Sequence, residues 1–190
     1  MELQKLVVAS TNEGKIAEIK AIFKSSEIIS MRELGFTEEI EETGTTFKEN
    51  AKIKAETVAK RFNLPALADD SGLCVNALDS APGIYSARFS GEGPAANRQL
   101  LLRRMENITD REAHFESAVC LCLPDGRTYF GEGKTYGTIL QEEIGTNGFG
   151  YDCLFFSYDL KKSFGLASDE EKNSVSHRFR ALENLKANLR

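Results

Sequence analysis

The stretch Leu67-Ala68-Asp69-Asp70-Ser71-Gly72 decides how this chain folds and what it binds. Two adjacent carboxylates follow a short apolar run, residues 66–68, which we expect to be a strand, and a small turn-forming pair comes next. Carboxylates at the carboxyl end of a strand lie where α/β sheets generally place ligands. Because two neighbouring negative charges repel, a counter-charge is expected, and Mg²⁺ suits an oxygen-rich site of this kind. The alternative is a turn in which Asp70 or Ser71 caps the backbone.

Hydrophobic periodicity outward from this stretch predicts alternating strands and helices. The clearest helix runs from Phe47 to Phe62, where apolar residues form an amphipathic stripe. Further helices are expected over residues 16–23, after Pro94 and Ser168, and over 181–189; further strands are expected over residues 6–9, 27–31, 73–75, 113–123, 128–133 and 153–156. Because hairpins and strand–helix–strand connections both occur, we expect an α/β fold with a mixed sheet.

The composition of the 190-residue chain is that of an ordinary globular protein, with 41% hydrophobic and 28% charged residues. Its length fits one domain, residues 1–190. The net charge of −5 argues against a nucleic-acid partner, which needs a basic face, but a few local cations suffice for a small anionic ligand. Because no apolar run of membrane length and no signal peptide is found, we expect no membrane contact and a cytoplasmic location.

The cysteines point away from disulfides and metal clusters. Cys74, Cys120, Cys122 and Cys153 show no C-x-x-C spacing, and the chain has only 2 histidines, which argues against a zinc cluster. Cys120 and Cys122 share one face of an expected strand, so they do not bridge easily. We therefore expect buried, reduced thiols.

The segment Ser10-Thr11-Asn12-Glu13-Gly14-Lys15 joins the first expected strand to the first expected helix. Such a turn exposes backbone N–H groups at the positive end of the helix dipole, and hydroxyls, an amide and Lys15 add further donors. The segment therefore suits an anion such as a triphosphate, although the Walker A spacing is absent. The alternative is ordinary helix capping by Ser10, Thr11 or Asn12.

An acidic loop and a lysine lie between this turn and the paired carboxylates. The loop is Glu41-Glu42-Thr43-Gly44, and Lys54 follows on the amphipathic helix. Taken alone, an acidic loop is usually solvated and a helical lysine is usually a surface charge. These residues gain meaning only together with the other charged segments.

Two downstream segments complete the candidate site. Residues 145–152 place Phe149 between glycines, so that backbone and ring can both approach a flat ligand, and Asp152 offers a charged acceptor. The run Ser176-His177-Arg178, with Lys172 before it, puts potential cations at a helix N-terminus, where acids are usual. An anionic or carbonyl partner would explain them. The alternatives are a Gly-rich turn that feeds a strand, and a solvated arginine beside a partly buried histidine.

In order along the chain, these segments resemble the inosine triphosphate pyrophosphatases, also called dITP/XTP pyrophosphatases, which cleanse the purine nucleotide pool. The resemblance covers essentially the whole chain. Its longest parts are A-D-D-S-G-L-C-V-N-A-L at 68–78 and A-P-G-I-Y-S-A-R-F-S-G-E at 81–92. The other parts are T-N-E-G-K at 11–15, E-E-T-G-T-T-F-K-E-N-A-K-I-K-A at 41–55, G-F-G-Y-D at 148–152 and S-H-R at 176–178.

This resemblance implies both a fold and a reaction. The implied fold is an elongated mixed β-sheet flanked by helices, in two lobes with the active cleft between them, and usually a homodimer. The implied reaction is Mg²⁺-dependent hydrolysis of ITP, dITP and XTP to the nucleoside monophosphate and pyrophosphate. Such an activity keeps nonstandard purines out of DNA and RNA.

The resemblance also implies roles for single residues. Glu41 and Asp70 would hold the metal ion, and Asp70 would accept the proton of the attacking water. Whether Glu42 or Asp69 shares the metal-binding role stays open. The residues implied to bind the substrate are Ser10, Thr11, Asn12, Glu13, Gly14, Lys15, Lys54, Ser71, Phe149, Gly150, Tyr151, Asp152, Lys172, His177 and Arg178.

The chain departs from the family pattern at two positions. Cys153 stands where proline is usual, and Phe179 stands where glycine is usual after S-H-R, which puts a large ring beside the expected base pocket. Two other functions stay open. One is a pyrophosphatase of similar fold that acts on dTTP, UTP or modified pyrimidines. The other is a nucleotide-binding regulator without turnover, which needs an incomplete metal site, whereas Glu41, Asp69 and Asp70 are all present.

Overall fold

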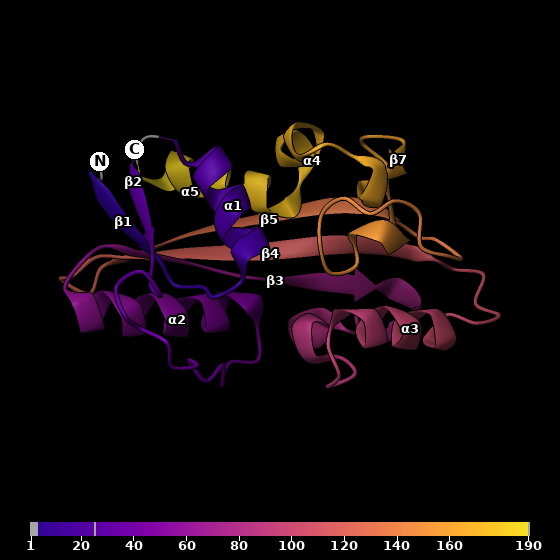
Figure 1. Cartoon of the computed structure of the whole chain (residues 1–190), viewed down its shortest axis with the longest axis horizontal. Coiled ribbons are helices and arrows are strands. Elements are labelled where there is room, and N and C mark those ends of the chain that lie inside the picture. Colours follow the sequence, from indigo (N-terminus) through magenta and orange to yellow (C-terminus); the bar gives the residue numbers. More distant parts are fainter. Residues whose placement is uncertain (1–3, 25, 190) are drawn as a thin grey trace. The chain divides into compact units, whose positions relative to one another are not determined.

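A computed structural model of the chain describes residues 4–24 and 26–189 (Figure 1). Over these residues the strands form a seven-stranded sheet in the order β2-β1-β3-β4-β5-β6-β7. The strands are β1 (Lys5–Val8), β2 (Glu27–Ser30), β3 (Ala66–Val75), β4 (Glu112–Cys122), β5 (Thr128–Ile139), β6 (Phe155–Ser157) and β7 (Lys162–Ser163). β1 pairs in parallel with β2 and β3, whereas β6 pairs antiparallel with β5 and β7. The predicted mixed sheet is confirmed.

The α-helices begin and end close to where the hydrophobic periodicity places them. They are α1 (Glu13–Ile22), α2 (Phe47–Phe62), α3 (Pro94–Arg104), α4 (Asp169–Val175) and α5 (His177–Asn188). Short 3-10 turns cover η1 (Asn76–Leu78), η2 (Gly83–Arg88), η3 (Asp152–Leu154) and η4 (Phe164–Leu166). The Ser168 hydroxyl and the Glu171 carboxylate form the predicted capping box that starts α4. Among the described residues, no helix is both long and apolar enough to cross a membrane.

The chain forms two compact units. Unit 1 comprises residues 1–70, 117–133 and 178–190, and unit 2 comprises residues 71–116 and 134–177. Each boundary but the last falls within β3, β4 or β5, so these strands contribute residues to both units. The chain first passes from unit 1 to unit 2 directly after Asp70, and its last return to unit 1 is at Arg178.

Unit 1 buries both faces of its part of the sheet. Leu6 and Val8 of β1 point to one face, where they pack with residues of α1 and α5. Val7 points to the opposite face and packs against the alanine-rich side of α2. This alternation follows from the two-residue period of a strand. In Figure 1, α2 lies on one side of the strands of unit 1, and α1 and α5 lie on the other. A parallel strand buried on both faces explains the unbroken apolar run of β1.

Unit 2 has a core of its own, built around aromatic rings. Phe115 of β4 lies 4.7 Å from Phe155 of β6 and 6.2 Å from Phe164, measured between ring centroids. Leu101 of α3 is fully buried in the same cluster. These side chains hold the antiparallel strands of unit 2 against its helices.

One expectation about the central strand is wrong. Residues 66–68 and 73–75 were expected to be separate strands, with Ser71 and Gly72 as a turn-forming pair between them, but β3 is a single strand of 10 residues. The register explains the difference, because β1 pairs with β3 only at Ala66 and Leu67. The two carboxylates therefore lie just past the end of β1, within a strand that continues beside β4.

Smaller corrections concern the other strands. β5 continues to Ile139, beyond the predicted end at residue 133. The predicted strand at 153–156 begins as the 3-10 turn η3 and becomes extended only at Phe155. β7 was not predicted, because a strand of 2 residues carries no readable periodicity.

Candidate functional site

A buried cluster of acids and cations surrounds Asp69 in unit 1. Asp69 is 1% exposed. Lys15 Nζ lies 2.8 Å from its Oδ2, and Arg178 Nη2 donates to the same oxygen at 3.2 Å. The hydroxyl of Ser117 donates to Oδ1 at 2.5 Å. Residues far apart in the sequence thus meet at one carboxylate.

The two cations decide the charge of Asp69. Burial alone would raise the pKa of this carboxyl group, because it disfavours the charged form. Arg178 and Lys15, with hydrogen bonds from Lys15 and Ser117, outweigh burial and hold the pKa of Asp69 well below its ordinary value. Asp69 is therefore ionised at neutral pH and serves to hold Lys15 and Arg178 in place.

Asp70 has a different environment. Lys54 Nζ donates to its Oδ1 at 3.2 Å and to the backbone carbonyl of Asp69 at 2.9 Å. Burial raises the pKa of Asp70, against the opposing effect of Lys54 and Lys15. Its second oxygen, Oδ2, is buried and has no hydrogen-bond partner among the described residues. A buried carboxylate oxygen of this kind is suited to a cation or to a reacting water.

Lys54 links this carboxylate to the acidic loop. Burial lowers the pKa of Lys54, but Asp70, Glu42 and Asp69 outweigh it, and the net shift is upward. Its Nζ lies 3.3 Å from Glu42 Oε1, whereas Glu41 is exposed. Of Glu41 and Glu42, it is therefore Glu42 that contacts the Lys54 ammonium group, which also contacts Asp70. This placement favours Glu42 over Glu41 as the partner of Asp70.

Arg178 joins the cluster from the start of α5 and is 1% exposed. Besides Asp69, it forms an ion pair with Glu18 of α1. Sequence reasoning missed Glu18 and Ser117. The available signals were an acid between Ile16 and Ile19 on the apolar side of α1, and a serine at an otherwise apolar position of β4.

The turn before α1 both caps that helix, through Asn12, and supplies a cation, Lys15. Asn12 is the N-cap of α1, and its side chain accepts from Lys15 N at 3.1 Å. Ser10 Oγ in turn accepts from Asn12 N at 3.1 Å. The capping interpretation thus holds for Asn12, whereas Lys15 extends its side chain to Asp69. Thr11 and Glu13 are exposed, and Gly14 is half-buried.

A second group of predicted residues meets within unit 2. Lys172 Nζ lies 2.6 Å from Asp152 Oδ2 and 4.5 Å from the centroid of the Phe149 ring. Asp152 Oδ2 also accepts from Phe149 N at 2.9 Å. Gly148 and Gly150, with φ values of 73° and 60°, shape the turn that presents the ring. The structure therefore brings the aromatic, the acid and the lysine together as the sequence suggested.

Two further predicted residues of unit 2 are buried. Tyr151 is 5% exposed, and its hydroxyl donates to the Ser86 carbonyl at 2.7 Å. His177 is buried, with its ring stacked on Phe115 at 4.9 Å between centroids. These contacts hold both side chains in place within unit 2. Ser71 follows Asp70 on β3 and is half-buried.

All 4 cysteines are buried and free of disulfides, as predicted. The argument against a zinc cluster rested on the missing C-x-x-C spacing and on the presence of only 2 histidines. In space, Cys74 lies beside His114 and Glu116, with the ligand atoms of all three within 4.8 Å of one another.

A mixed α/β sheet whose central strand carries two buried carboxylates among cations defines an α/β protein suited to a small anionic ligand. The chain belongs to the Ham1 family, whose model matches residues 6–188. It is 44% identical over 193 residues to the dITP/XTP pyrophosphatase of Bacillus licheniformis, with 98% of each chain covered. It is 42% identical over 189 residues to that of Staphylococcus epidermidis, covering 98% of this chain and 97% of the relative.

Solved structures give the same family. The Staphylococcus aureus Ham1 protein superposes with a TM-score of 0.87 at 43% identity, covering 98% of each chain. A structure from Mycobacterium abscessus described as a nucleoside-triphosphatase and dITP/XTP pyrophosphatase has a TM-score of 0.76 at 42% identity, covering 95% of this chain and 97% of the other.

Proposed function

We propose that this protein hydrolyses nonstandard purine nucleoside triphosphates, namely ITP, dITP and XTP, to the nucleoside monophosphate and pyrophosphate. The names of the relatives support this reaction, since those from Bacillus licheniformis and Staphylococcus epidermidis are dITP/XTP pyrophosphatases. One observation on this chain carries the proposal furthest. Asp70 is buried beside Lys54 and next to Asp69, and its Oδ2 has no hydrogen-bond partner among the described residues.

The residues around Asp70 fit a Mg²⁺ ion. Glu42 and Asp70 share the ammonium group of Lys54, at 3.3 and 3.2 Å, so a positive charge already lies between two carboxylates. Oxygen ligands of this kind, with phosphate oxygens and water, are those that Mg²⁺ takes. We propose that Asp70 and Glu42 hold the ion, with Glu41 as the alternative to Glu42. When bound, Mg²⁺ would neutralise phosphate charge and polarise the phosphorus.

Asp70 is the proposed general base. A carboxylate whose pKa is raised by burial accepts a proton more readily than an ordinary aspartate does. In the proposed reaction, Asp70 takes a proton from the water that attacks the α-phosphorus, and pyrophosphate leaves. Lys15 and Lys54 offer positive charge to the triphosphate, and such positioning and charge stabilisation supply most of the catalysis in phosphoryl transfer.

The nucleoside is proposed to bind at Phe149. Its ring offers a stacking surface for a purine, and Lys172 and Asp152 fix the turn that carries it. Hypoxanthine and xanthine present a carbonyl at C6, where adenine presents an amino group. A protein group that donates a hydrogen bond to this carbonyl would favour hypoxanthine and xanthine. It would reject adenine, because the protein donor and the adenine amino group would face each other and neither would have an acceptor. Arg178, which the resemblance implies as a substrate-binding residue, stays our proposed donor.

The experiment that tests this function is a panel of purified nucleoside triphosphates, with and without Mg²⁺, in which pyrophosphate release is measured. We expect ITP, dITP and XTP to be turned over and ATP, GTP and the pyrimidines to be poor substrates. Turnover of dTTP or UTP instead would favour the pyrimidine alternative. Tight ITP binding without hydrolysis would favour the regulator. We also propose that the protein is cytoplasmic and forms a homodimer. Sedimentation of the purified protein would test the dimer.

A further inference from the structure

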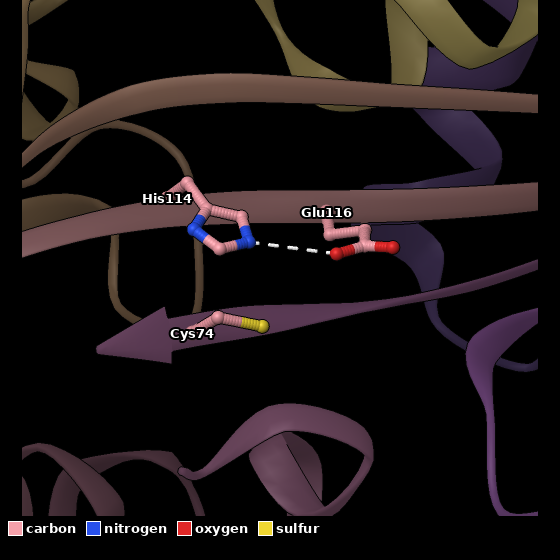
Figure 2. Close-up of side chains that lie close together, drawn as sticks. All are labelled: Cys74, His114 and Glu116. Carbon is pink, nitrogen blue, oxygen red and sulfur yellow. Dashed lines mark ion pairs between the residues drawn. The ribbon is translucent and has the colours of Figure 1, made fainter. Parts of the chain in front are cut away.

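Cys74, His114 and Glu116 form a group of metal-binding side chains on the strands of unit 2, separate in composition from the acids at Asp70. Cys74 belongs to β3, and His114 and Glu116 lie two residues apart on β4, so both point to the same face of that strand. Their ligand atoms all lie within 4.8 Å of one another. Figure 2 shows the imidazole and the carboxylate turned toward each other, with the cysteine sulfur beside them.

We propose that these three side chains bind one divalent transition-metal ion, and that Zn²⁺ is the ion they fit. Zn²⁺ takes cysteine sulfur, histidine nitrogen and carboxylate oxygen together, whereas Mg²⁺ and Ca²⁺ take oxygen. Three protein ligands leave a fourth position for water, as is usual in zinc sites that are not closed.

The spacing of the ligand atoms supports this assignment. Two ligands each about 2.0 Å from a tetrahedral zinc ion lie roughly 3.3 Å apart. His114 Nε2 and Glu116 Oε2 are separated by 3.4 Å, so this edge of a tetrahedron is already formed. A sulfur ligand and a nitrogen ligand in the same geometry lie about 3.6 Å apart. Because the Cys74 sulfur lies within 4.8 Å of the other two ligand atoms, it needs at most a small movement to reach this spacing.

The exposure of these side chains lets an ion enter. The side chains of His114 and Glu116 are 16% and 26% exposed, whereas Cys74 is buried. Burial, and then the neighbouring Glu116, raises the pKa of the Cys74 thiol to about 11. The incoming ion must therefore displace the thiol proton, which passes to solvent, and the affinity is lower than for a preformed thiolate.

The ammonium group of Lys134 competes with a metal ion for the Glu116 carboxylate. Its Nζ lies 3.1 Å from Glu116 Oε2, so the ammonium group neutralises the carboxylate when no metal ion is bound. The Lys134 side chain is 43% exposed and can move away into solvent. Removing this charge is expected to tighten metal binding about two- to fivefold, the range of an exposed ion pair.

The test uses the purified full-length chain, freed of metal with a chelator and then titrated with Co²⁺ in excess Mg²⁺. Because Mg²⁺ fills oxygen sites, we expect a thiolate-to-cobalt charge-transfer band that saturates at one ion per chain and disappears on adding Zn²⁺. Cys74→Ser should abolish the band and weaken Zn²⁺ binding at least about a hundredfold, since even indirect partners of metal ligands cost ten- to a hundredfold. Cys122→Ser, which changes another buried cysteine, is the matched control and should keep the band.

Two further variants protect the test from a folding artefact. His114→Ala should also weaken Zn²⁺ binding, and Lys134→Met should strengthen it; each is checked for native circular dichroism without metal. Zn²⁺ should raise the melting temperature of the wild type but not of Cys74→Ser, because binding to the folded chain stabilises it. The proposal is overturned if the wild type gives no charge-transfer band, if Cys74→Ser keeps it, or if His114→Ala binds Zn²⁺ as tightly as the wild type.

Discussion

Asp69 and Arg178 form a fully buried ion pair that joins the central strand to the start of the last helix. Arg178 Nη2 donates to Asp69 Oδ2 at 3.2 Å, and Nε lies 3.2 Å from Oδ1. Each charge has a second partner, Lys15 for Asp69 and Glu18 for Arg178. Because every charge is paired, the cluster tolerates burial, and removal of any one member leaves another charge uncompensated.

The first expectation concerns the stability that depends on this pair. Asp69→Asn leaves Arg178 and Lys15 short of a counter-charge in a buried place, and we expect a loss of about 3–5 kcal/mol in the free energy of unfolding. Urea denaturation measures it. The matched control is Asp125→Asn, which breaks an aspartate–arginine pair at the exposed hairpin turn, 2.7 Å from Arg127. A surface pair is worth about 1 kcal/mol or less. Equal losses in the two variants would contradict the buried-pair interpretation.

The same residue gives the chain a defined acid sensitivity. The pKa of Asp69 in the folded state is well below its ordinary value, so its stabilising contribution is complete above the unfolded pKa of about 3.9 and is lost as the pH falls toward the folded pKa. We expect the free energy of unfolding to decline below about pH 4. The decline should be shallower in Asp69→Asn, measured by urea titration at several pH values. A variant with the same slope as the wild type would exclude Asp69 as the source.

Removal of the proposed base should separate activity from folding. Asp70→Asn keeps the size of the side chain but cannot accept a proton, and we expect turnover of ITP to fall by a factor on the order of a hundred or more. The melting temperature should change little, because Lys54 keeps Glu42 as a counter-charge at 3.3 Å. Near-wild-type turnover would remove Asp70 from this role.

The two acids of the loop should differ in their effect on metal dependence. Glu42 lies 3.3 Å from Lys54 Nζ and so beside Asp70, whereas Glu41 is exposed. We expect Glu42→Gln to raise the Mg²⁺ concentration needed for half-maximal activity by about tenfold or more, on the scale of a lost metal partner. Glu41→Gln, measured in the same titration, should behave like the wild type. The reverse pattern would restore Glu41 as the ligand.

The sequence predicted most of the fold, because its signals were local. The stripe from Phe47 to Phe62 and the capping box at Ser168 specify α2 and α4 without reference to the rest of the chain. The continuity of β3 was missed, because it depends on neighbouring strands: β1 ends beside Leu67, while β3 runs on to Val75. Ser71 and Gly72 were predicted to form a turn, whereas the neighbouring strands hold them in an extended conformation within β3.

The site was predictable as a set of segments but not as a set of contacts. Lys15, Lys54 and Arg178 were named, and the structure brings all three to Asp69 or Asp70. Which acid each cation meets was not readable, because ion pairs depend on side-chain geometry across strands and helices. For the same reason Glu18 was not predicted as a partner of Arg178, and Cys74 was not predicted beside His114.

Hydrolysis of ITP in heavy-oxygen water, with Mg²⁺ and the wild-type chain, tests the central chemistry most directly. If water activated by Asp70 attacks the α-phosphorus, mass spectrometry should find the heavy oxygen in the inosine monophosphate and none in the pyrophosphate. Label in pyrophosphate or in inorganic phosphate, or the absence of any turnover, would contradict this reaction.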